Sequence, residues 1–186
     1  NRGHDVEIYK ESIKPVKIEK IKADVLCLHS ITSSSRRAYQ IATEFKKLNP
    51  NSRVIIGGIH ASLMPEEAIK YVDQVVVGEA ESIIVDVIEG KYKDKIVYGS
   101  RIQDLDKLPF PDFSLIKHLK GSMFYHPITT SRGCPFNCNF CSVTEMFGRR
   151  YRFRSEDNVI AELAKQKYKR ICSRIFLKFR QEDEIQ

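Results

Sequence analysis

Short apolar runs alternate with amphipathic stretches along the first 100 residues of the chain. The runs at 6–9, 24–29, 53–56 and 73–77 predict strands, and the run at 24–29 is almost wholly apolar. Continuous apolar character is typical of a strand in a parallel sheet whose two faces are both covered. Residues 96–98 predict one more short strand. The apolar pattern therefore favours a parallel sheet.

Helical periodicity lies between these runs. In residues 33–48 apolar side chains recur every three or four positions, and Asn49-Pro50 ends the helix. Pro65 opens a second helix, because proline suits the first helical turn, and residues 79–88 predict a third. Strands that alternate with helices in this order indicate an α/β fold with a doubly wound parallel sheet.

Ligands of a doubly wound sheet bind beyond the carboxyl ends of its strands. Three segments fall at this edge: 29–33, 57–60 and 78–81. Taken alone, Gly57-Gly58 predicts only a tight turn. Its position after a buried strand favours the close approach of a ligand, because glycine has no side chain to block it.

The second part of the chain has a different organisation. Residues 101–125 lose periodicity, residues 127–130 predict a strand that leads into a cysteine-rich loop, and residues 175–179 predict a later strand. Residues 155–167 predict a helix capped by Ser155. We therefore expect an α/β domain at 1–100, a linker at 101–125 and a second domain at 126–186.

Composition is that of an ordinary globular protein, with 42% hydrophobic and 30% charged residues. The 31 Lys and Arg residues exceed the 24 Asp and Glu residues, which gives a net charge of +7. These basic residues are scattered along polar helix faces, so we interpret them as a solvated surface and expect no nucleic-acid partner. No apolar run reaches the length of a membrane span. The first residues do not have the pattern of a signal peptide. Because the chain does not begin with Met, we expect it to be part of a longer protein.

Five cysteines are present, and three of them fall within eight positions. They are Cys27, Cys134, Cys138, Cys141 and Cys172. A secreted disulfide scaffold would spread its cysteines, so this grouping favours thiolate ligands in a reducing compartment, the cytoplasm. Cys27 lies in an apolar run and is predicted to be a small buried hydrophobic residue.

The spacing C-x-x-x-C-x-x-C places three thiolates on one short loop. Thiolates are soft ligands that suit zinc or an iron–sulfur cluster. Three cysteines on a 4Fe–4S cluster leave one iron without a protein ligand, and such an open position is what catalysis requires. The alternative is a structural zinc site with His126 or Cys172 as fourth ligand. Zinc motifs usually present paired C-x-x-C units, and a second pair is missing here.

The segment Cys-Pro-Phe-Asn-Cys-Asn-Phe-Cys at 134–141 resembles the signature of radical S-adenosylmethionine enzymes. Residues 77–81, 108–111 and 129–133 are similar to the motifs of the subgroup that carries an N-terminal cobalamin-binding domain. This resemblance covers nearly the whole chain. It implies a Rossmann-like cobalamin-binding sheet followed by the start of a partial (β/α) barrel.

The resemblance also implies roles for the loop residues. Cys134, Cys138 and Cys141 would each bind an iron, while the amino and carboxylate groups of S-adenosylmethionine would chelate the fourth iron. Reduction would release a 5′-deoxyadenosyl radical or support methyl transfer through cobalamin, with an electron donor such as flavodoxin or ferredoxin and a small-molecule substrate. Phe140 would lie near the adenine of S-adenosylmethionine, or would pack the loop onto the barrel.

Four residues of the first domain match positions that line the nucleotide tail of cobalamin in that fold: Ser30, Thr32, Gly57 and Gly58. The Asp-x-His-x-x-Gly motif, whose His ligates cobalt, does not occur in the chain, and by the family's layout it would precede Asn1. Cobalamin binding is therefore an expectation that rests on those four residues.

The second domain is short for the implied fold. Residues 126–186 cannot supply a whole barrel, which takes about 200 residues or more. We therefore expect a fragment of a radical enzyme, assign no catalytic residue and expect the chain alone to be inactive. The alternative is a non-catalytic cobalamin- or zinc-binding module left by truncation.

Overall fold

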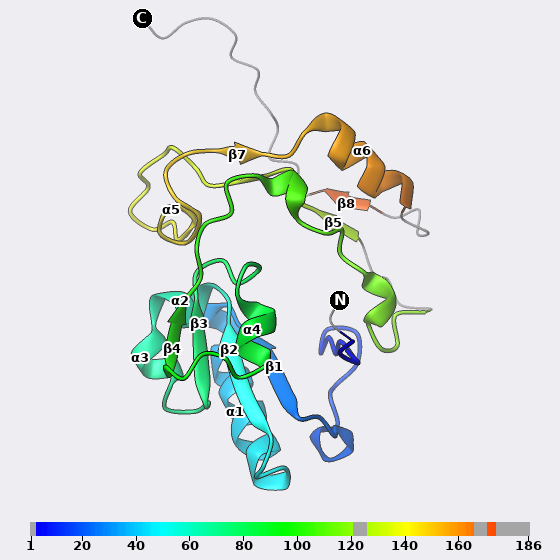
Figure 1. The fold of residues 1–186 in the computed structure, drawn as a ribbon, viewed down its shortest axis with the longest axis vertical. Coiled ribbons are helices and arrows are strands. Elements are labelled where there is room, and N and C mark those ends of the chain that lie inside the picture. The colour runs from blue at the N-terminus through cyan, green and yellow to red at the C-terminus, as the bar shows by residue number, and fades with distance from the viewer. Residues whose placement is uncertain (1–2, 121–125, 166–170, 174–186) are drawn as a thin grey trace, which may run out of the picture. The chain divides into compact units, whose positions relative to one another are not determined.

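The computed structural model describes residues 3–120, 126–165 and 171–173, and the chain divides into two compact units (Figure 1). The sheet unit comprises Val16–Gln103 and Gly133–Arg150. The crossover unit comprises Asn1–Pro15, Asp104–Arg132 and Tyr151–Gln186. The loop that carries the three clustered cysteines thus belongs to the same compact unit as the N-terminal sheet. The division of the sequence at 101–125 into two successive domains stays a prediction.

The sheet unit is built on four parallel strands in the order β1-β2-β3-β4. Their bounds are β1 (Val25–His29), β2 (Arg53–Gly57), β3 (Gln74–Val77) and β4 (Ile96–Tyr98). The register pairs Cys27 with Ile55 and Val75 with Ile96. The strands predicted at 24–29, 53–56, 73–77 and 96–98 are therefore confirmed.

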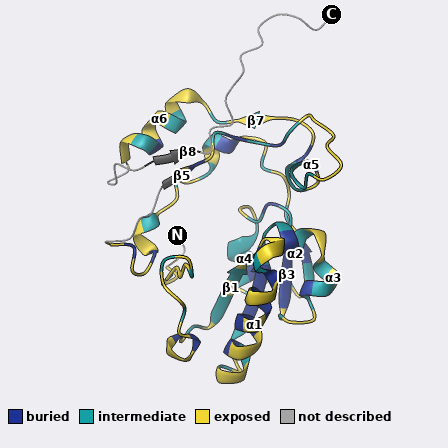
Figure 2. Ribbon diagram, turned by 180° about the vertical axis from the view of Figure 1, so that it is seen from behind, coloured by how far each residue is buried: buried dark blue, intermediate teal, exposed yellow. Residues whose placement is uncertain are grey.

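Helices cover both faces of this sheet, as a doubly wound fold requires. They are α1 (Thr32–Leu48), α2 (Ile59–Leu63), α3 (Pro65–Ala68) and α4 (Ile84–Ile88), with a 3-10 turn η1 at Ile18–Lys20. Side chains alternate along β2: Val54 packs with Phe45 of α1, whereas Ile55 packs with Val87 of α4. Figure 2 shows β3 buried and α1 divided into a buried and an exposed side.

Two helices differ from the prediction. Pro65 does start α3, but the preceding α2 was not predicted, and α4 begins at Ile84 rather than at residue 79. Glu79 is only 2% exposed, and its carboxylate accepts the Ile102 amide at 3.0 Å. This long-range hydrogen bond holds residue 79 outside the helix, and local periodicity carries no sign of it.

The predicted strand at 6–9 is wrong. Ile8 forms one isolated bridge, with Ile116 in the crossover unit. A single bridge lacks the repeated hydrogen bonds that make a strand, so the apolar residues of this segment remain exposed.

Cys27 is exposed, so its predicted burial is also wrong. Side chains alternate along β1, where Leu28 packs on the α1 side and Cys27 points to the other face. Among the described residues, β1 is an edge strand of the sheet, and the apolar cluster under α4 includes Val25 of β1 but not Cys27. An apolar run therefore does not guarantee cover on both faces.

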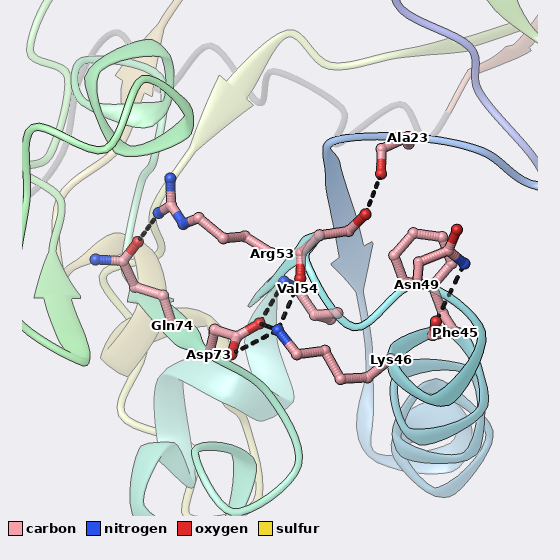
Figure 3. A network of polar contacts seen from close by, with 9 residues as sticks. Ala23, Phe45, Lys46, Asn49, Arg53, Val54, Asp73 and Gln74 are labelled. Carbon is pink, nitrogen blue, oxygen red and sulfur yellow. Dashed lines mark hydrogen bonds and ion pairs between the residues drawn. The ribbon is translucent and has the colours of Figure 1, made fainter.

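Polar contacts tie the amino ends of β2 and β3 together (Figure 3). The Lys46 ammonium lies 2.9 Å from an Asp73 carboxylate oxygen, and the same oxygen accepts the Val54 amide at 2.8 Å. The Arg53 guanidinium donates to the Gln74 side chain at 2.7 Å. This edge of the sheet is thus closed by the protein's own groups, which leaves the carboxyl ends as the place for a ligand.

The crossover unit contains a strand–helix–strand crossover. Its elements are β5 (His126–Ile128), α6 (Glu156–Lys165) and β8 (Ile171–Ser173), together with β6 (Ser131–Arg132), β7 (Arg152–Phe153) and the 3-10 turns η2 (Leu105–Lys107) and η3 (Phe113–Leu115). β5 and β8 are parallel, whereas β6 and β7 are antiparallel. A parallel pair joined through a helix is the repeating element of a (β/α) barrel.

The predicted strand at 127–130 is confirmed in its first half, and Ser155 caps α6 by accepting the Asn158 amide at 3.2 Å. The strand predicted at 175–179 lies outside the described residues. Within the described ranges, no helix combines the length and the apolar character that a membrane crossing needs.

Candidate functional site

The turn at Gly57-Gly58 lies at the carboxyl end of β2, beside the end of β1. Gly58 has a φ of +97°, and a Cβ atom there would come within 2.7 Å of the Ser30 carbonyl oxygen and of the His29 ring. A Cβ atom at Gly57 would meet only ordinary contacts, the nearest being the Val76 carbonyl oxygen at 3.5 Å. Gly58 is therefore required by the chain's own packing, and Gly57 is not.

Ser30 follows β1 and has no exposed surface. Its amide donates to the Gly57 carbonyl at 3.2 Å, and its own carbonyl accepts the His60 amide at 3.3 Å. Among the buried side chains that the structure describes, its hydroxyl oxygen is the one without a hydrogen-bond partner. A buried polar atom without a partner costs about 1–3 kcal/mol. A polar ligand group at this edge would relieve that cost, so Ser30 fits a bound cofactor.

Thr32 is held by a network that the sequence did not predict. Its hydroxyl lies 3.3 Å from Nδ1 of the buried His60, and Nε2 of His60 lies 3.1 Å from the Tyr39 hydroxyl and 3.3 Å from a Glu67 oxygen. Burial, and secondly the Glu67 carboxylate, raise the pKa of Tyr39 to about 12. Thr32 thus has an internal partner where Ser30 has none. His60 lies within the predicted segment 57–60, but only its contacts identify it as the centre of a network.

The third predicted edge segment, 78–81, is occupied by structural contacts. The Gly78 amide donates to the Ser62 hydroxyl at 3.0 Å, and Glu79 binds the Ile102 amide. Of the three segments at this edge, those at 29–33 and 57–60 are therefore the better ligand candidates.

The cysteine loop is closed at its base by two glycines with positive φ. Gly133 (φ +89°) leaves no room for a Cβ atom, which would lie 2.0 Å from the Arg150 carbonyl oxygen. The Cys134 amide donates to the carbonyl of Gly148 (φ +88°) at 3.1 Å. The helix α5 (Val143–Phe147) lies between these two ends. The base of the loop is thus fixed by backbone geometry.

The three cysteines share this loop without a disulfide. Cys138 is exposed, while Cys134 and Cys141 are half-buried. In the described ranges, no three His, Cys, Asp or Glu side chains are gathered as ligands of one metal ion. The donor set, three thiols within eight residues, fits an iron–sulfur cluster by its chemistry. The alternative zinc ligands, His126 and Cys172, belong to β5 and β8 in the crossover unit.

Phe140 is 93% exposed, so its ring is open to a ligand. The alternative role of packing the loop onto the barrel finds no support in this exposure. The second aromatic residue of the loop, Phe136, is 67% exposed. The loop thus presents two uncovered aromatic rings beside the thiols.

The cysteine loop and the glycine turn meet through their helices. α5 begins two residues after Cys141, α2 begins directly after Gly58, and the two helices pack together in the sheet unit. The segment that carries the thiols therefore lies beside the carboxyl edge of the sheet, which contains Ser30.

Comparison with known proteins identifies the sheet of this arrangement. Residues 1–88 match the family of B12 binding domains. An uncharacterized methyltransferase of Pyrococcus horikoshii is 31% identical over 171 residues, which cover 79% of this chain and 37% of that protein. The bacteriochlorophyllide d C-8(2)-methyltransferase of Chlorobaculum tepidum is 36% identical over 140 residues, covering 69% of this chain and 30% of that protein.

Two further similarities extend across most of the chain. The anaerobic magnesium-protoporphyrin IX monomethyl ester cyclase of Rubrivivax gelatinosus is 27% identical over 179 residues, covering 79% of this chain and 32% of the cyclase. The radical S-adenosylmethionine methyltransferase TsrM of Kitasatospora setae shares the fold, with a TM-score of 0.54 and 16% identity, over 78% of this chain and 35% of that structure. The chain thus spans about a third of the length of these curated relatives. Its residues 1–88 thus belong to the B12 binding domains, and most of the chain shares the fold of a radical S-adenosylmethionine methyltransferase.

Proposed function

We propose that this chain serves a radical S-adenosylmethionine enzyme that uses a 4Fe–4S cluster and cobalamin. The reaction would be methyl transfer, cyclisation or rearrangement of a small molecule, in keeping with the methyltransferases and the cyclase among its relatives. One observation carries the proposal: α5, next to the three cysteines, packs against α2, next to the glycine turn of the B12-binding sheet. This packing would hold two cofactors side by side.

On the cobalamin side, Ser30 is the residue that the structure supports best. Its buried, unpartnered hydroxyl can donate one hydrogen bond to an acceptor group of the cofactor. Gly57 and Gly58 form the turn beside it, and Thr32 begins α1 with its hydroxyl on His60. Bound cobalamin would supply methyl-group or redox chemistry at cobalt.

On the cluster side, Cys134, Cys138 and Cys141 would bind three irons as thiolates, and the exposed Phe140 would offer its ring to the adenine of S-adenosylmethionine. Held there and reduced, such a cluster would supply the electron for cleavage of S-adenosylmethionine. The Cys134 amide is already bound to the Gly148 carbonyl, which orients the first thiol by its backbone. An electron donor of the flavodoxin or ferredoxin kind, a small-molecule substrate and a cytoplasmic location complete the proposal.

Anaerobic reconstitution tests the cluster. We expect a brown, oxygen-sensitive protein with about four irons per chain, because three thiolates suffice to hold a 4Fe–4S cluster. Replacing Cys134, Cys138 or Cys141 by Ala should abolish the charge-transfer absorbance. Cys27→Ala and Cys172→Ala are matched controls that should retain it. Stoichiometric zinc without charge-transfer absorbance would favour a zinc-binding module instead and would end the proposal.

A further inference from the structure

Arg101 follows β4 and reaches the helix that closes the cysteine loop. Its Nη2 atom donates to the main-chain carbonyl of Glu145 at 3.2 Å. Glu145 lies in α5, which has only five residues. The last four carbonyls of a helix have no partner within it, and the carbonyl of Glu145 is one of these. A guanidinium at this end supplies both a donor and a favourable positive charge.

The backbone on both sides of Arg101 is anchored to the sheet. At Gly99, a Cβ atom would lie 2.0 Å from the Glu79 carbonyl oxygen, so the chain runs directly against the end of β3. At Ile102, the amide donates to the buried Glu79 carboxylate at 3.0 Å. Arg101 therefore projects from a segment whose position is set by the carboxyl edge of the B12-binding sheet.

Arg101 also meets the glycine at the base of the loop. A Cβ atom at Gly148 would lie 3.0 Å from Nη1 of Arg101. The carbonyl of the same glycine accepts the Cys134 amide. One guanidinium thus contacts the end of α5 and the residue that holds the first cysteine.

We propose that Arg101 is a positioning residue that fixes the cysteine loop against the B12-binding sheet. The contacts run from Glu79 through the segment 99–102 to Glu145 and Gly148, and from there to Cys134. The consequence for the cluster rests on the proposed function, whereas the contact itself does not. The two parts can therefore be tested separately.

The contact is tested in the metal-free chain by hydrogen–deuterium exchange of peptides covering 133–148. Arg101→Ala should raise exchange in this segment about fivefold, the effect of losing one hydrogen bond. Peptides of β1, β2 and β3 should be unchanged. Arg101→Lys keeps the charge and one donor and should restore most of the protection. Arg36→Ala removes an exposed arginine from α1 and should change nothing.

The consequence is tested on the reconstituted chain. Arg101→Ala should bind as much iron as the wild-type chain, because the three thiols remain. It should lose that iron to a chelator about fivefold faster, and the electron paramagnetic resonance spectrum of its reduced cluster should differ. Arg101→Lys should resemble the wild-type chain in both measurements.

Three results would overturn the inference: unchanged loop exchange in Arg101→Ala, an equal rise of exchange throughout the sheet unit, or an equal effect of Arg36→Ala. If exchange rises in the loop but no variant or wild-type chain takes up a cluster, the contact stands and the proposed function fails. If exchange rises and the cluster forms with unaltered release and spectrum, the proposed role toward the cluster fails.

Discussion

Among single residues, Ser30 and Gly58 carry the most information about the edge of the sheet. Both were predicted to line a cofactor, yet their environments differ. The hydroxyl of Ser30 is buried without a partner, whereas Gly58 is pressed against His29 and Ser30. Ser30 therefore has a group available for a ligand, and Gly58 is explained by the fold itself.

Ser30→Ala separates ligand binding from stability. In the absence of cofactor the variant should be as stable as the wild-type chain or slightly more so, because it removes an unsatisfied hydroxyl. Hydroxocobalamin should raise the melting temperature of the wild-type chain and raise that of the variant less. Ser35→Ala is the matched control: its buried hydroxyl donates to the Thr32 carbonyl at 3.0 Å. It should destabilise the chain and leave the cobalamin response intact. A full cobalamin response in Ser30→Ala together with a weakened response in Ser35→Ala would exclude Ser30 from the cofactor site.

Gly58→Ala should lower the free energy of unfolding by about 2 kcal/mol or more, since a non-glycine residue at this φ is strained and its Cβ atom meets backbone. Gly57→Ala should cost less, because its Cβ atom finds ordinary contacts. Urea unfolding of the cofactor-free chain measures both. Equal costs for the two variants would contradict the geometric distinction between the glycines.

At the scale of elements, α6 is tied to the end of β5 by Arg154. Its guanidinium contacts the buried carboxylate of Glu162 and donates to the Thr129 carbonyl at 3.0 Å, while its amide donates to the Thr130 carbonyl at 2.9 Å. The side chains of Arg154 and Glu162 are 10% and 4% exposed. Removing one member of a buried pair leaves the other charge without compensation.

Arg154→Met should therefore lower the free energy of unfolding by about 3 kcal/mol. Lys107→Met in the same unit is the control. Its partner is Asp104, and the two side chains are 82% and 53% exposed, so the loss should be about zero. Urea unfolding followed by far-ultraviolet circular dichroism gives both values. Similar small losses would mean that solvent screens the Arg154 pair.

At the scale of the whole molecule, the relevant fact is that the chain spans about a third of its curated relatives. The proposed cluster needs only the ligands of the cysteine loop, so we expect it to form on residues 1–186. Cleavage also requires S-adenosylmethionine in reacting geometry, and small misplacements cost about a hundredfold in rate. A (β/α) barrel that could provide such geometry takes about 200 residues or more.

We therefore predict that residues 1–186 with a reduced cluster do not produce 5′-deoxyadenosine or S-adenosylhomocysteine above background. A chain extended to the length of the relatives should do so. Both chains are assayed under dithionite, with the Cys138→Ala variant of the longer chain as the blank. Robust product from the shorter chain would show that its residues suffice for cleavage.

Features that depend on neighbouring residues could be predicted from local sequence patterns. Continuous apolar runs predicted β1 to β4, because the strands of a parallel sheet are covered on both faces, and apolar positions every three or four residues predicted α1. The spacing of Cys134, Cys138 and Cys141 predicted a thiolate site, because ligands on one loop are close in sequence. The caps at Pro65 and Ser155 followed from the chemistry of a single helical turn.

Features that depend on residues far apart in the chain became evident from the folded molecule alone. Cys27 is exposed because the apolar cluster under α4 extends on β1 only to Val25, Ser30 lacks a partner because the residues around it offer none, and Arg101 reaches an α5 carbonyl 44 positions away. The same long-range packing places residues 133–150 in one compact unit with the B12-binding sheet. Hydrophobic periodicity reports which side of an element is buried. It does not report which distant residue fills the space, and that choice determines the site.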